Sequence, residues 1–138
     1  MRTTLVGTLV ALLVGSVTAP LVAKDKPHKP KLDVRVLPRM GMAPSEVLVM
    51  ADLREGDDLE DFYCLEMEVD WDDGTRSVKE SDCPPFEPGT KIERHYSASH
   101  EFRRSGIYNV KVTLRHSDQV VAAGKIDVTL RAGFGEAE

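Results

Sequence analysis

The sequence is poor in the residues that mark the common catalytic and metal-binding motifs. It contains two cysteines, one tryptophan and four histidines among 138 residues. Two cysteines 19 residues apart, with no second pair, have a poor spacing for zinc. The histidines do not share a metal-ligand spacing either: His28, His95, His100 and His116. Because no phosphate-binding loop or nucleophile elbow occurs, we expect a non-enzymatic protein without a metal centre.

The first 23 residues have the pattern of an export signal. Met1 and Arg2 form a short basic start, residues 5–17 are an apolar run, and Ala23 is the small residue that a signal peptidase requires. The alternative is an uncleaved anchor, since residues 3–23 are uncharged and long enough to span a bilayer. We predict a signal peptide over residues 1–23 and a periplasmic or secreted protein, with membrane contact only if this segment is retained.

The remainder divides into a linker, one domain and a tail. Residues 24–31 are basic and contain two prolines, which is typical of an extended linker. Residues 132–138 are small and acidic, as in a flexible tail. The expected domain therefore covers residues 32–131.

Export makes a disulfide the simplest use of two cysteines. An even number of cysteines in an oxidising compartment predicts a bridge between Cys64 and Cys83. Closing a loop of about 20 residues stabilises a fold by roughly 3 kcal/mol in the chain-entropy model.

Negative charge is concentrated in the middle of the chain. Residues 52–87 contain 14 acidic and three basic residues, so this segment carries 3 − 14 = −11 charges, against −5 for the whole sequence. This concentration disfavours nucleic acid and anionic membranes as partners and favours a basic protein.

The acidic segment 54–61 also raises the question of Ca²⁺. It includes Asp57 and Asp58, and carboxylate oxygens are the ligands that Ca²⁺ prefers. The spacing is not that of an EF-hand. We expect a solvated acidic loop and no cofactor, with Ca²⁺ binding as the alternative that stays open.

Alternating apolar and polar residues predict an all-β domain. Pro38, Gly41 and Pro44 indicate a loop over residues 39–45. Gly106 is expected to form a corner before a strong strand that ends at Leu114. The predicted strands are residues 32–37, 46–53, 63–71, 76–81, 91–97 and 120–130, together with the alternating run from Tyr108 to Leu114 after the corner at Gly106.

The strand over residues 63–71 is expected to be the centre of the domain. Its odd positions are apolar and end at Trp71, which places the single tryptophan in the core. Its even positions put Cys64, Glu66 and Glu68 on the outer face, so the disulfide should attach this strand to the loop beyond the next turn rather than join two sheets. A solvent-facing carboxylate row also lacks the apolar cleft that a glycosidase needs.

Two motifs in this order resemble the PKD (polycystic kidney disease) domain, an immunoglobulin-like β-sandwich. The family's W-D-F-G-D-G-T motif is matched by residues 69–75, and its later H-x-Y-x-x-x-G-x-Y motif by residues 100–108. An upstream G-x-A-P is matched by residues 41–44. The matching positions with structural roles are Val69, Asp70, Trp71, Asp73, Gly74, His100, Phe102, Gly106 and Tyr108.

This sequence departs from the family pattern at three points. Val69 stands at the family's tryptophan, Asp72 replaces the first glycine of the turn, and a segment containing Cys83 and three prolines is additional. The resemblance covers residues 32–131. It implies an antiparallel sandwich of about seven strands that serves as a spacer or as a protein or carbohydrate contact module.

Together these patterns predict an exported, non-enzymatic binding module for a protein or glycan of the envelope or the extracellular space. Prolines make residues 83–89 a rigid loop that displays Phe86. The candidate contact residues are Phe86, Glu66, Glu68, Asp57 and Asp58. Two alternatives stay open: a small periplasmic or secreted inhibitor or accessory subunit, and a metal-dependent hydrolase that uses His95 or His100.

Overall fold

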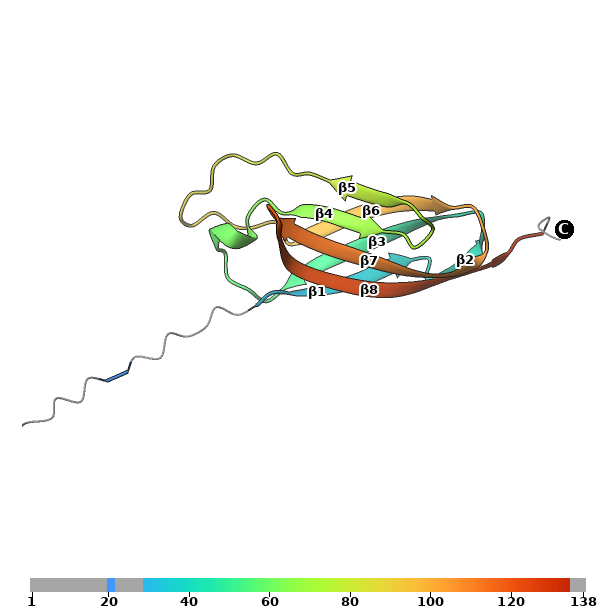
Figure 1. The fold of residues 1–138 in the computed structure, drawn as a ribbon, viewed down its shortest axis with the longest axis horizontal. Helices are drawn as coiled ribbons and strands as arrows, with labels where there is room; N and C mark the ends of the chain where they lie inside the picture. Colours follow the sequence, from blue (N-terminus) through green and yellow to red (C-terminus); the bar gives the residue numbers. More distant parts are fainter. Residues whose placement is uncertain (1–19, 22–28, 135–138) are drawn as a thin grey trace, which may run out of the picture.

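The computed structural model describes residues 20–21 and 29–134, which include two β-sheets packed face to face (Figure 1). The three-stranded sheet has the order β1 (Lys31–Leu37), β3 (Ser45–Arg54), β6 (His95–Phe102). The five-stranded sheet has the order β2 (Met40–Ala43), β8 (Gln119–Ala132), β7 (Gly106–His116), β4 (Glu66–Asp70), β5 (Arg76–Lys79). A short 3₁₀ turn, η1 (Glu60–Phe62), precedes β4. The expected all-β sandwich is confirmed.

The segment expected as a loop at residues 39–45 contains a strand, β2. It pairs in parallel with the end of β8, Met40 opposite Thr129, whereas the other strand pairs are antiparallel. The prolines in this segment favoured the prediction of a loop. In the structure, Pro38 and Pro44 flank β2 and do not interrupt it. An edge strand of four residues tolerates such flanks because one side of its backbone needs no partner. Here the chain crosses from one sheet to the other.

Two predicted strands begin later than expected. The strand expected from residue 91 begins at His95, because the Glu93 carboxylate accepts the backbone N–H groups of Arg94 and His95 at 3.1 and 2.9 Å. That strand then pairs with β3 as far as Phe102. The strand expected over residues 63–71 is β4, which begins at Glu66 because Cys64 has a φ of 55°, outside the extended region. It lies next to an edge of its sheet, not at the centre as expected.

Trp71 is the centre of the core, as expected. Its side chain is fully buried, and its ring stacks on His100 with centroids 4.7 Å apart and an interplanar angle of 16°. Phe102 meets the same ring edge-on at 6.0 Å. The indole Nε1 donates a hydrogen bond to Ser77 Oγ at 2.8 Å, so the one polar atom of the ring is satisfied.

The corner before β7 also follows the prediction. Tyr108 is half-buried and its hydroxyl donates to the backbone carbonyl of Arg104 at 2.7 Å. Its ring packs against Phe102, with centroids 4.3 Å apart. This contact fixes the β6–β7 loop on the core and so sets the position of the side chains that the loop carries.

Trp71→Ala should lower the free energy of unfolding by about 3–5 kcal/mol, as truncation of a large buried aromatic does. That is a large share of the roughly 5–15 kcal/mol available to a small domain. Urea unfolding followed by circular dichroism measures the loss. Val78→Ala, at an exposed position of β5, is the control and should change stability little. Equal midpoints for the two variants would contradict a core role for Trp71.

Candidate functional site

The segment between β5 and β6, residues 80–94, contains no strand and is pinned at the start of β4. The predicted disulfide is confirmed: Cys64 and Cys83 are bonded, with Cα atoms 5.9 Å apart. The Tyr63 hydroxyl donates to the carbonyl of Pro84 at 2.7 Å, and the Tyr63 and Phe86 rings lie 5.3 Å apart. Three contacts therefore hold residues 83–89, which we call the pinned loop.

Phe86, one of the candidate contact residues, is partly packed and partly exposed. It packs on Tyr63, yet it is only half-buried. The pinned loop as a whole is exposed, because Pro84, Pro85 and Glu87 all face solvent. The disulfide attaches the loop to the residues just before β4, whereas the sequence predicted a bridge to the strand itself.

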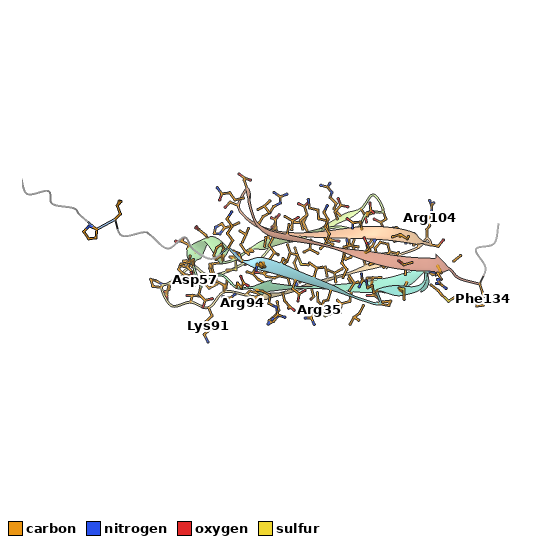
Figure 2. All side chains as sticks on the ribbon, turned by 90° about the horizontal axis from the view of Figure 1, so that it is seen from below. Arg35, Asp57, Lys91, Arg94, Arg104 and Phe134 are labelled. Atoms are coloured by element: carbon orange, nitrogen blue, oxygen red, sulfur yellow. A yellow bond between two sulfur atoms is a disulfide. The ribbon has the colours of Figure 1, made fainter. Side chains whose placement is uncertain are left out.

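The acidic loop at residues 54–61 is organised by an internal cation, Arg94. Its guanidinium donates to the carbonyls of Glu55 and Gly56 at 2.9 and 3.1 Å, and to Asp58 Oδ1 at 3.1 Å. Arg94 thus binds three oxygen atoms of the acidic loop. Asp57 remains exposed, and Figure 2 shows it at the same end of the molecule as Arg94 and Lys91.

The carboxylate row of β4 differs from the expected free acidic face. Arg76 on β5 lies 3.7 Å from Glu68 and 3.4 Å from Asp70, and Arg115 on β7 lies 3.6 Å from Glu68. Glu66 stands opposite Arg115 in the register. The structure therefore separates the predicted contact residues: Glu66 and Glu68 lie among basic side chains on the sheet, while the other three lie in the end loops.

A buried carboxylate, Asp52, organises the outer face of the three-stranded sheet. Its side chain is 9% exposed and bonds His95 Nδ1 at 2.7 Å, with Arg35 as a second partner and Arg54 at 3.6 Å. The hydrogen bond from His95 lowers the pKa of Asp52, burial opposes that change, and Arg35 reinforces it. Sequence reasoning missed Asp52, because its partners come from strands far away in the chain.

The second histidine considered for catalysis, His100, is held by the β4–β5 turn. Its Nε2 lies 2.6 Å from Asp73 Oδ2 and 3.5 Å from Thr75 Oγ1, and the Thr75 hydroxyl itself bonds Asp73. A nucleophilic triad needs the carboxylate and the hydroxyl on opposite ring nitrogens, whereas here they share one. Asp73, Thr75 and His100 therefore form a structural link between the turn and β6.

Hydrogen bonding also affects the pKa of Asp73 in this link. Burial raises the pKa of Asp73, but the hydrogen bonds from Thr75 and His100 outweigh it, so that the pKa lies below its usual range. Asp73 is thus a carboxylate whose acceptor capacity is largely used inside the fold.

The β4–β5 turn accounts for Asp72, which stands where the PKD motif has a glycine. Asp72, at the place of a family glycine, has a φ of 62°, a conformation that aspartate tolerates better than most residues. Its carboxylate accepts the N–H of Asn109 at 2.8 Å, a contact that glycine cannot provide. Gly74 has a φ of 87° and retains the glycine that this geometry favours.

A hollow lies near the acidic loop, where the β7–β8 hairpin meets η1. It has a volume of about 760 Å³, and its apolar lining includes Phe62, Val120 and Val121. His116 Nδ1 donates to the carbonyl of Asp61 at 2.9 Å, which joins the hairpin to η1. This hollow gives the acidic end an apolar recess.

Neither a metal-ligand group nor a membrane span is found in the part of the chain that the structure describes. No three His, Cys, Asp or Glu side chains are grouped there as ligands of one ion. No helix among residues 20–21 and 29–134 has the length and apolarity to cross a bilayer. The predicted signal peptide lies almost entirely outside the described residues, and the predicted linker and tail lie partly outside them.

Comparison with known proteins supports the fold. No family model matches the sequence, and no curated protein matches it. The structure is similar to that of the PKD domain of an M14-like peptidase from Thermoplasmatales archaeon SCGC AB-540-F20, with a TM-score of 0.52 and 17% identity. The match covers 78% of this chain and 98% of that chain. The domain thus has a PKD-like fold, as its motifs indicated.

The lowered pKa of Asp52 predicts a loss of stability in acid. A folded-state pKa below the unfolded value of about 3.9 adds stability above that pH, and this stability is lost as the pH falls through the folded-state pKa. Asp52→Asn should therefore flatten the decline of the unfolding free energy below about pH 4. Urea unfolding between about pH 2 and 6 measures it, with Asp118→Asn on the exposed hairpin as the charge-matched control. Equal slopes in both variants would refute the prediction.

We also predict that Ca²⁺ and Na⁺ at matched ionic strength shift the melting temperature equally, because Arg94 already occupies the oxygens of the acidic loop. Charge screening depends on ionic strength, whereas a specific ligand adds stability by mass action. Differential scanning fluorimetry with either chloride salt makes the comparison. An additional rise in Ca²⁺ that disappears in Asp57→Asn/Asp58→Asn would instead establish a calcium site.

Proposed function

We propose that this protein is an exported, non-enzymatic interaction module that presents its pinned loop to a partner protein. The observation that carries the proposal is the pinning itself. Long irregular loops in compact domains are usually functional, and this one is fixed by a disulfide, a hydrogen bond and an aromatic contact. A loop that is already ordered loses little conformational freedom on binding, which favours affinity.

The chemistry around the loop favours a basic partner. The exposed carboxylates of Glu80, Asp82 and Glu87 lie in or beside the pinned loop, and Asp57 and Glu60 lie in the acidic loop at the same end. Complementary charge speeds association and makes it sensitive to salt. The apolar recess beside η1 and the half-buried Phe86 offer places for the apolar anchors that stable interfaces use.

The compartment is part of the proposal. A disulfide in a small domain is typical of an oxidising environment, and the first 23 residues have the pattern of an export signal. A periplasmic or extracellular inhibitor or accessory subunit would use the same surface, and it would differ in the activity of the partner once that partner is bound.

Site-specific photo-cross-linking in the native envelope tests the proposal. A photoreactive residue at Glu87, in the pinned loop, should give a discrete cross-linked partner whose yield falls steeply with salt. The same residue at Ser105, an exposed position in the β6–β7 loop, is the matched control and should not give that product. Phe86→Ala should reduce the yield at Glu87. Equal products from both positions, or a yield insensitive to both salt and Phe86→Ala, would refute a binding role for this loop.

A further inference from the structure

An open pocket of about 600 Å³ lies at the end of the sandwich away from the acidic loop. The β4–β5 turn, the end of β6 and the β6–β7 loop supply its lining, which includes Asp73, Thr75, His100, Glu101, Arg103 and Arg104. Figure 2 shows Arg104 at this end and Asp57 at the other. The pocket is therefore separate from the surface assigned above to a protein partner.

Two consecutive guanidinium groups in this pocket have no acidic partner. Arg103 and Arg104 are exposed, and within the described part of the chain neither forms an ion pair with a carboxylate. The arginines that have carboxylate partners are Arg35, Arg54, Arg76, Arg94 and Arg115. The Tyr108 hydroxyl holds the carbonyl of Arg104, so the backbone that carries both arginines is ordered.

Neither carboxylate of the pocket forms an ion pair with these arginines in the described part of the chain. Asp73 is bonded to Thr75 and His100, which uses its acceptor capacity. Glu101 stands directly opposite Glu46 on β3, and no cation in the described ranges forms an ion pair with either of them. The pocket thus has hydrogen-bond donors in excess at Arg103 and Arg104.

We propose that this pocket binds an oxyanion, a carboxylate, sulfate or phosphate group, held by Arg103 and Arg104. Guanidinium groups bind such groups through paired, charge-assisted hydrogen bonds. The carrier is either a free small anion or an acidic sugar, whose hydroxyls Glu101 and Thr75 would meet at the rim. This assignment does not depend on the protein partner of the pinned loop, and either proposal can fail alone.

Nuclear magnetic resonance titration of the protein tests the site. Inorganic phosphate should shift the Nε–Hε signals of Arg103 and Arg104 with saturation, whereas chloride at equal ionic strength should not. Arg103→Gln/Arg104→Gln should weaken binding by about tenfold or more, as loss of charge-assisted bonds does. Arg39→Gln/Arg131→Gln removes the same charge from exposed arginines near this end that also lack an ion pair in the described structure. This variant should change affinity less than about twofold, because neither side chain lines the pocket and salt screens exposed charges outside it.

Two further measurements identify the molecule that bears the anionic group and exclude a general attraction between opposite charges. A glucuronate oligosaccharide that binds more tightly than phosphate establishes an acidic sugar as the ligand, and the reverse order establishes a small anion. Glu101→Gln should raise the affinity for either anion by removing repulsion. Unsaturable shifts, equal losses in the two double variants, or weaker binding in Glu101→Gln would overturn the proposal.

Discussion

The stack of Trp71 on His100 is the contact on which much of this molecule depends, because it joins the two sheets through one aromatic pair. Trp71 follows β4 of the five-stranded sheet, and His100 lies on β6, an edge strand of the three-stranded sheet. The far nitrogen of the imidazole then bonds Asp73 in the β4–β5 turn. One histidine therefore couples core packing to the conformation of a turn, and the pocket with its two arginines is built on that turn. The PKD-like motif residues gather at this point because it is where the sheets are held together.

Periodicity predicted most of this fold, since it reports which side of a strand is buried. It gave the strand centres and the burial of Trp71 correctly, because each depends on neighbours in the sequence. Its argument for Cys64 does not apply, because that residue has a φ of 55° and lies before the strand. It missed β2, whose stability comes from β8 about 90 residues later in the chain. It also took the β4 carboxylates as a free acidic face, because Arg115 is brought beside Glu68 only by the β4–β7 pairing.

The concentration of negative charge in the middle of the sequence is partly balanced inside the fold. Arg94 binds the acidic loop, and Arg76 and Arg115 border the carboxylates of β4. Such exposed pairs add little stability individually, but they reduce repulsion where the sequence alone suggests it would be greatest. The carboxylates that remain without a cation lie mainly in the end loops. The net charge of residues 52–87 therefore overstates the negative charge on the sheet. The carboxylates without a cation form an acidic surface mainly at one end of the domain.

The disulfide joins Cys64 to Cys83 beside one sheet and does not cross the core. Its constraint acts on a surface segment, whereas the packing of the two sheets is maintained by buried apolar side chains. The disulfide thus constrains the loop locally, and the buried side chains stabilise the sandwich as a whole. Reduction would remove one of the three contacts that hold the pinned loop and none of the buried contacts between the sheets. The redox conditions around the chain would thus act on the conformation of the pinned loop before they act on the core.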